Sequence, residues 1–190
     1  MEQRPKMVLI YGSVTGKTEY IAENMVEYFR PELNLELVDV SSIEATDLAA
    51  YDFAICGIPT WDVGELEYGW QDIFDKLDDV NLAALTVAMF GLGDQHNYGE
   101  TYQDAIGIMY EKLLAQGATG KIGFTSTEGH EFVESLAVID GMFCGLALDE
   151  DNQDELTDER MMNWARQLKA ELAESKPELF EEANEAKQGA

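Results

Sequence analysis

The sequence GSVTGKT at residues 12–18 directly follows the apolar run MVLIY at residues 7–11. The apolar run has the length and composition of a buried strand, and apolar residues then recur at helical spacing from Ile21 to Phe29. A strand, a short polar loop and a helix start direct backbone N–H groups and the positive end of a helix dipole to one place. The loop therefore predicts an anion site, most commonly for phosphate, to which its hydroxyl groups add donors without positive charge.

A nucleotide-hydrolysing P-loop is a rival interpretation of this stretch. Its pattern is G-x-x-x-x-G-K-[ST], and Gly16-Lys17-Thr18 match the end of that pattern. The first glycine would have to stand at position 11, which is Tyr11, and no strand ends in an obvious magnesium-binding aspartate. The P-loop is therefore disfavoured, and a plain turn between strand and helix remains the other alternative.

The charge of the chain is strongly negative. Its 190 residues contain 12 Lys+Arg and 38 Asp+Glu, which gives a net charge of −26. Such a chain is not expected to bind nucleic acid, whose phosphates need basic partners. The charge favours steering toward a basic partner protein, with a general adaptation to solubility or salt as the alternative. The length predicts one domain at residues 1–175, followed by an acidic tail at 176–190 that we expect to fray.

The location of the protein is predicted from its apolar runs and cysteines. No apolar run approaches the roughly 20 residues of a membrane span, and the run after the N-terminus is too short for a signal sequence. Cys56 and Cys144 lie in predicted strands without CxxC spacing, so we expect buried free thiols rather than a disulfide or a metal site. We therefore expect a cytoplasmic protein with no metal and no membrane contact.

Strand and helix patterns alternate along the chain. Further strands are predicted at residues 33–39, 53–57 and 85–90, with helices at 70–77 and 102–116 and a last helix from Thr157. The third strand is expected to stop at Pro59. The fifth strand is predicted in two pieces, 121–124 and 143–148, separated by a long polar insertion. The alternation predicts an α/β fold, in which helices cover both faces of a parallel sheet.

Three loops of unusual composition leave the carboxyl ends of the predicted strands, at residues 12–18, 59–65 and 91–98. Ligands of open α/β sheets bind at that edge, where the strand order reverses, so we expect these loops to converge on one pocket. Trp61 and Tyr98, from separate loops, can sandwich a flat ring. A phosphate site beside two aromatic rings describes flavin mononucleotide (FMN), whereas a tryptophan between Pro and Gly can also be a core residue.

The motifs S-x-T-G-x-T at residues 13–18, P-T-W at 59–61 and G-L-G-D-Q at 91–95 resemble those of the flavodoxin family. The resemblance covers residues 7–172, and an insertion at 125–142 is similar to that of the long-chain subgroup. It implies a doubly wound five-stranded parallel sheet in the order 2-1-3-4-5 with FMN at the switch point, an arrangement for which flavodoxin is itself a type example.

The resemblance also implies the residues of an FMN site. The phosphate would be held by residues 13–18, mainly through backbone N–H groups and hydroxyls. Trp61 would cover the inner face of the isoalloxazine ring and Tyr98 the outer face. Asp94 would reach the pyrimidine edge, and Asp151 would lie near the ribityl chain. The implied cofactor-binding residues are Ser13, Val14, Thr15, Gly16, Lys17, Thr18, Pro59, Thr60, Trp61, Asp62, Val63, Gly64, Gly91, Leu92, Gly93, Asp94, Gln95, Asn97, Tyr98 and Asp151.

Two residues depart from the family pattern. Asp62 stands where relatives often carry Asn or Gly, in the segment whose peptide is expected to rotate toward reduced flavin. An Asp–Val peptide rotates less readily than one that contains glycine, so the sequence leaves the redox potentials open. His96 precedes Tyr98 by two positions, and we expect it to be exposed rather than linked to the flavin.

The function implied by the resemblance is that of a low-potential one-electron carrier. The chain would act as a monomer in transient contact with basic redox proteins, such as a ferredoxin/flavodoxin-NADP reductase, and with low-potential acceptors. No constellation of catalytic acid, base or nucleophile is identified, so we do not expect an enzyme. Two classes compete: a flavin-dependent NAD(P)H:quinone reductase on the same fold, which Tyr98 should obstruct, and a non-redox regulatory domain that binds phosphate.

Overall fold

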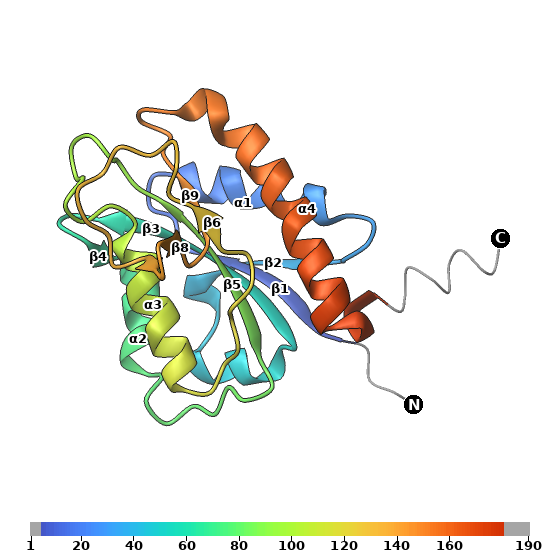
Figure 1. The fold of residues 1–190 in the computed structure, drawn as a ribbon. Helices are drawn as coiled ribbons and strands as arrows, with labels where there is room; N and C mark the ends of the chain where they lie inside the picture. The colour runs from blue at the N-terminus through green and yellow to red at the C-terminus, as the bar shows by residue number, and fades with distance from the viewer. Residues whose placement is uncertain (1–4, 181–190) are drawn as a thin grey trace.

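A parallel sheet forms the centre of the fold (Figure 1). The structure is a computed structural model that describes residues 5–180. The strand order is β2-β1-β3-β5-β9, which confirms the doubly wound arrangement predicted from the sequence. The strands of this path are β2 (Glu36–Asp39), β1 (Met7–Tyr11), β3 (Phe53–Trp61), β5 (Thr86–Leu92) and β9 (Leu146–Leu148).

Within residues 5–180, helices pack on both faces of the sheet (Figure 1). The helices are α1 (Lys17–Phe29) and α4 (Thr157–Ser175) on one face, and α2 (Tyr68–Asp75) and α3 (Asp104–Ala115) on the other. Alternate residues of β3 enter the two layers: Phe53 and Ile55 pack with α1 and α4, whereas Ala54 and Cys56 pack with α2 and α3. The central strands are apolar throughout because both of their faces are buried.

The third strand is longer than predicted. It continues past Gly57 and Pro59 to Trp61, where we expected it to stop at the proline. Its neighbour β1 ends opposite Gly57, so the part of β3 beyond it pairs with β5 but, among residues 5–180, has no parallel strand on its other side. A proline, which lacks an N–H donor, is tolerated where a strand is paired on one side only. The extension makes Trp61 the last residue of the strand.

The fifth strand differs from the prediction. Residues 121–124 are not a strand, and Gly123 has a φ of 67°, in the left-handed region that interrupts an extended chain. The insertion forms a small antiparallel sheet of β6 (Thr125–Ser126), β8 (Met142–Phe143) and β7 (Val138–Ile139). Cys144 lies between β8 and β9 rather than within a strand. As expected, both cysteines are buried free thiols, and burial raises the pKa of Cys56 and of Cys144 to about 12.

Short 3-10 helices complete the described chain: η1 (Val40–Ser42), η2 (Ala45–Ala50), η3 (Asp154–Leu156) and η4 (Pro177–Phe180). The helix η4 begins within the tail that we expected to fray. Its Leu179 is buried against the layer of α1 and α4, so this part of the tail packs on the domain because it offers an apolar residue. The remainder of the predicted tail, residues 181–190, lies outside the described residues.

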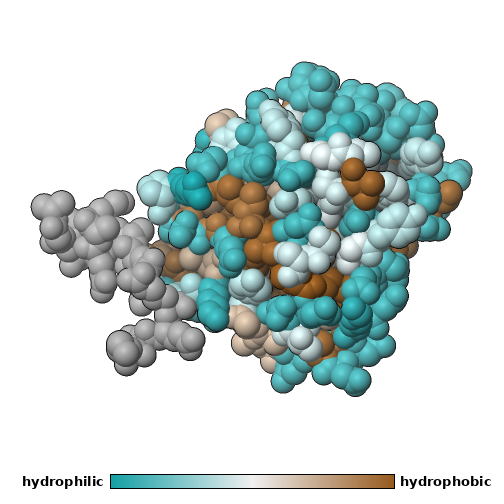
Figure 2. All heavy atoms as spheres, turned by 180° about the vertical axis from the view of Figure 1, so that it is seen from behind, coloured by the Kyte–Doolittle hydropathy of each residue, from teal (hydrophilic) through white to brown (hydrophobic). Residues whose placement is uncertain are grey.

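The surface reflects the acidic composition. Figure 2 shows one face that is mostly hydrophilic, with hydrophobic residues gathered toward its centre. Within residues 5–180, no helix has both the length and the apolar character that crossing a membrane requires.

Alanine at Gly107 should destabilise the fold by about 2 kcal/mol, because the added methyl would overlap backbone atoms, which cannot move aside as a flexible side chain can. A Cβ added to Gly107 would lie 2.3 Å from the carbonyl oxygen of Leu136 and 2.7 Å from the backbone nitrogen of Ala137, so the insertion packs directly on α3 there. Overpacking typically costs about 1–3 kcal/mol, and the higher helix propensity of alanine returns about 1 kcal/mol. Urea unfolding of Gly107→Ala measures the difference, and a variant as stable as the unmodified protein would contradict the close packing.

Candidate functional site

The three loops converge on one cavity at the carboxyl ends of the strands. The cavity has a volume of about 320 Å³, within the usual range for small-molecule sites. It lies beside the point where the order reverses between β1 and β3, as expected for a doubly wound sheet. The lining residues are Val14, Thr15, Lys17, Thr18, Pro59, Thr60, Trp61, Asp62, Leu92, Gly93, Asp94, Tyr98, Thr101, Tyr102, Glu150 and Asp151.

The first loop is fixed by backbone contacts. Gly12 donates to the carbonyl of Gly57 at 3.1 Å, and a Cβ at Gly12 would lie 2.3 Å from a carboxylate oxygen of Glu67. Within residues 5–180, the N–H groups of Val14 and Thr15 have no protein acceptor and are available to a ligand. Together with the start of α1 at Lys17, they form an anion site of the kind that the sequence predicts.

One hydroxyl of this loop has a structural role instead. The Oγ of Ser13 accepts the N–H of Gly16 at 3.1 Å, and Ser13 is not among the residues that line the cavity. Gly16 adopts a φ of 84°, which a residue with a side chain rarely does. The hydroxyl of Ser13 therefore holds the turn as an acceptor.

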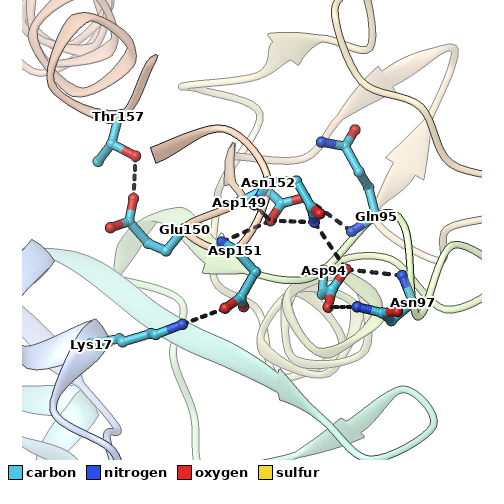
Figure 3. A network of polar contacts seen from close by, with 9 residues as sticks. All are labelled: Lys17, Asp94, Gln95, Asn97, Asp149, Glu150, Asp151, Asn152 and Thr157. Atoms are coloured by element: carbon cyan, nitrogen blue, oxygen red, sulfur yellow. Dashed lines mark hydrogen bonds and ion pairs between the residues drawn. The ribbon is translucent and has the colours of Figure 1, made fainter. Parts of the chain in front are cut away.

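Lys17 and Asp151 meet at the cavity. The Nζ of Lys17 lies 2.6 Å from the Oδ1 of Asp151, although the residues are 134 positions apart in the chain (Figure 3). Both side chains are about half exposed, at 49% and 52%. The positive charge of Lys17 is thus already paired, which leaves neutral N–H groups as the main donors for an anion.

The second loop is a tight hairpin that presents Trp61. Strand β3 pairs with the antiparallel strand β4 (Glu65–Leu66), and Trp61 stands opposite Glu65. Two turn residues have positive φ, Asp62 at 43° and Gly64 at 90°. The Trp61 ring packs on the exposed ring of Tyr68, with centroids 6.1 Å apart. The hairpin therefore supports Trp61 on the wall of the cavity.

In the third loop, the carboxylate of Asp94 is engaged by the protein. It accepts the N–H groups of His96 and Asn97 and the side-chain amides of Asn97 and Asn152. Partial burial alone would raise the pKa of Asp94, but these hydrogen bonds outweigh it and lower the pKa below its ordinary value. Asp94 lines the cavity, where we expect it to meet a ligand, and its oxygens also hold the loop in shape. His96 is exposed, as expected.

A buried carboxylate joins the third loop to the end of β9 (Figure 3). Asp149 is fully buried and accepts the N–H of Gln95 at 3.0 Å. It also accepts the N–H groups of Asp151 and Asn152 at 3.1 and 3.0 Å. Asp149 was not predicted as a site residue, and its partner Gln95 is 54 positions away along the chain.

The structure adds lining residues and separates others from the cavity. Thr101, Tyr102 and Glu150 line it but were not predicted. Glu150 directly precedes Asp151, which was a usable signal, whereas Tyr102 was predicted only as the start of a helix. The predicted residues that do not line the cavity are Ser13, Gly16, Val63, Gly64, Gly91, Gln95 and Asn97. Gly91 lies within β5, Val63 projects outward with 75% of its surface exposed, and the others shape the loops.

The donor set of the cavity fits FMN. Free N–H groups at a helix start can bind a phosphate. The carboxylates of Glu150 and Asp151 can accept hydrogen bonds from hydroxyl groups. The rings of Trp61 and Tyr98 can stack on a flat ring. No group of three or more His, Cys, Asp or Glu residues in the described part of the chain is arranged to hold a metal ion.

A doubly wound α/β domain with an anion loop and an aromatic pair at its switch point defines a nucleotide-cofactor-binding protein of the flavodoxin-like class. Residues 9–164 match the family model described as flavodoxin. The chain belongs to the flavodoxin family.

Named relatives extend over most of the chain. A flavodoxin of Nostoc sp. (strain PCC 7120) is 48% identical over 168 residues, which cover 88% of this chain and 97% of the relative. Flavodoxin 2 of Escherichia coli (strain K12) is 45% identical over 170 residues, again 88% and 97% of the two chains. The crystal structure of Fusobacterium nucleatum flavodoxin bound to flavin mononucleotide has a TM-score of 0.80 at 30% identity, covering 87% of this chain and 98% of that one.

Proposed function

We propose that this protein is an FMN-containing, low-potential carrier that transfers single electrons between redox proteins. The observation that carries the proposal is the convergence of the free N–H groups of the first loop with Trp61 and Tyr98 on one cavity. The FMN found in the F. nucleatum flavodoxin supports the choice of cofactor. Flavodoxins are electron-transfer proteins rather than enzymes, so neither alternative function is favoured.

Each part of the cavity has an assigned role in this proposal. The N–H groups of Val14, Thr15, Lys17 and Thr18 bind the phosphate, Trp61 covers the inner face of the flavin ring and Tyr98 its outer face. The backbone of Gly93 and Asp94 meets the pyrimidine edge of the flavin. The Asp94 carboxylate holds this part of the loop by accepting the N–H groups of His96 and Asn97. Asp151, already paired with Lys17, lies at the ribityl chain.

Bound FMN supplies the one-electron redox chemistry, and the protein supplies position and electrostatics. The carboxylates near the cavity disfavour additional negative charge there, which lowers the potential for adding an electron. Charges beyond about 10 Å are largely screened at ordinary ionic strength, so Asp62, Asp94, Glu150 and Asp151 matter more than the net charge of −26.

The surroundings of the cavity suit a transient basic partner. Val14, Val63 and Tyr98 are exposed apolar or aromatic residues at the loops, at 56%, 75% and 49%. Acidic residues on the same loops, including Asp62, steer positively charged proteins. We propose a monomer in the cytoplasm that meets a reductase of the ferredoxin/flavodoxin-NADP type and low-potential acceptor proteins.

A spectroelectrochemical titration of the purified protein tests this function. FMN binding and two separate one-electron potentials, the second of them low, are expected. A colourless protein that does not bind added FMN would refute the proposal. Rapid steady-state turnover of NAD(P)H and a quinone by the protein alone would instead favour the reductase alternative.

Lys17→Ala should weaken FMN binding only about threefold to fivefold, because exposed ion pairs contribute about 1 kcal/mol or less. Its ammonium group is shared with Asp151, and the backbone donors of the loop remain in place. Isothermal titration calorimetry with FMN measures the dissociation constant. Riboflavin, which lacks the phosphate, is the comparison ligand. Complete loss of FMN binding in Lys17→Ala would show that the lysine, not the backbone, dominates.

A further inference from the structure

The insertion is attached to the segment that carries the third loop into α3. Val133 of the insertion donates its N–H to the carbonyl of Gly99 at 2.7 Å, and Glu134 donates to the same carbonyl at 3.0 Å. Leu136 donates its N–H to Oδ1 of Asp104 at 2.7 Å. The insertion therefore lies directly behind one wall of the cofactor cavity.

Asp104, the first residue of α3, lies between the insertion and the hairpin of the second loop. Only 7% of Asp104 is exposed. Its Oδ1 accepts the Leu136 N–H, and its Oδ2 would lie 2.9 Å from a Cβ added to Gly64. Gly64 is one of the two hairpin residues with positive φ. One carboxylate is thus hydrogen-bonded to Leu136 and occupies the space beside Gly64, more than 70 positions away in the sequence.

The neighbouring residue contacts the same hairpin. Ala105 donates its N–H to the Oγ1 of Thr60 at 3.3 Å, on the strand that leads into Trp61. The start of α3 therefore contacts the hairpin on both sides of Trp61, through Thr60 before it and Gly64 after it. Burial raises the pKa of Asp104, the Leu136 N–H acts in the opposite direction, and the Glu134 carboxylate raises it further.

We propose that Asp104 is a positioning residue for the flavin site, which ties the Asp62–Gly64 turn to the insertion and so fixes the conformation of the hairpin that carries Trp61. The proposal rests on the function proposed above. An acidic residue in the first turn of a helix also interacts favourably with the helix dipole. That interaction alone would require neither the Leu136 N–H nor the contact with Gly64.

The role is tested by truncating the carboxylate and by replacing it with a neutral group of the same shape. In Asp104→Ala, the FMN dissociation constant should rise about tenfold, as expected for the loss of one charge-assisted hydrogen bond that orders the site. The separation between the two one-electron potentials should change by about 59 mV, which corresponds to a tenfold change in the equilibrium between them. Amide exchange at Leu136, measured by NMR, should become faster.

Asp104→Asn keeps an oxygen acceptor for the Leu136 N–H and should restore the dissociation constant to within about threefold. Glu134→Gln is the matched control, because it removes a nearby exposed carboxylate whose contacts do not include the hairpin. It should leave FMN binding and Leu136 exchange unchanged. If Asp104→Ala does not fold, Asp104→Ser provides the truncation.

Two failures are distinguishable. If the unmodified protein does not bind FMN, the proposed function is wrong. If the unmodified protein binds FMN, but truncation at Asp104 changes neither the dissociation constant nor the two potentials, then Asp104 is only structural and the positioning role is wrong. An Asp104→Asn variant as impaired as Asp104→Ala would also overturn it, because charge rather than position would then be responsible.

Discussion

Trp61→Ala is expected to weaken FMN binding about 30-fold, which is a loss of about 2 kcal/mol. The indole lines the cavity and is supported from outside by Tyr68, so its removal takes away one covering face of the flat ring and leaves the other, at Tyr98, in place. The two one-electron potentials should also shift, because water gains access to the ring. Fluorescence titration with FMN and spectroelectrochemistry measure both effects.

Val63→Ala is the matched control for this prediction. Val63 belongs to the same turn, but 75% of its surface is exposed and it does not line the cavity. The control should bind FMN as the unmodified protein does, and Trp61→Phe should recover most of the lost affinity. Unchanged affinity and potentials in Trp61→Ala would remove Trp61 from the proposed site.

The fold was predictable because its signals are local. Strand β1 is a run of apolar residues, and the apolar residues of α1 recur at helical spacing and form one stripe that faces the sheet. Both elements can therefore be predicted without knowing which distant residues they contact. The predicted end of β3 at Pro59 was wrong because proline is excluded only from strands that are paired on both sides. Which side of β3 remains unpaired beyond Gly57 follows only from the length of β1.

The interrupted fifth strand shows a second limit. Residues 121–124 have a strand-like composition, but their pairing depends on backbone conformation and on which segment reaches β5 first. Thr119 makes an isolated bridge to Thr86, and β9 occupies the position beside Phe90–Leu92. Short apolar segments on either side of a long insertion do not indicate which of them enters the sheet.

The sequence was enough to predict which loops form the site, but not which residues of those loops contact one another. The glycines, hydroxyls and aromatic residues follow strand ends, so the cavity follows from the α/β pattern itself. The roles of Asp94 and Asp149 instead depend on Asn152 and Gln95, 58 and 54 positions away. The local bonds from His96 and Asn97 to Asp94 can be read from the sequence, whereas the bond from Asn152 cannot, because that residue comes from a distant part of the chain.

The stability of the fold is expected to decrease by about 2 kcal/mol between pH 6.5 and pH 4 through His130 alone. His130 is half-buried in the insertion, and its Nδ1 lies 2.9 Å from the hydroxyl of Tyr102, which lines the cavity. Burial lowers the pKa of His130 to about 4, with Arg160 acting in the same direction and Asp149 against it. The value of about 2 kcal/mol, rather than the full shift, allows for the exposed part of the ring.

The sign follows from the two protonation states. The unfolded chain binds a proton at this histidine near pH 6.5, whereas the folded chain binds it only near pH 4. Between these values unfolding takes up a proton, so the contribution is complete above pH 6.5 and is lost as the pH falls toward 4. Urea unfolding of the FMN-free protein across this range measures the decrease.

A double variant separates His130 from the many carboxylates that titrate in the same range. His130→Phe with Tyr102→Phe removes both hydrogen-bonding partners and retains the ring contacts with Phe143, so it should lose this pH dependence while remaining folded. NMR titration of the His130 imidazole should give a midpoint near 4, with His96→Phe used to assign the two histidine signals. A midpoint at the ordinary value would show that the insertion admits water to the Tyr102 hydroxyl, and the lowered pKa would then be wrong.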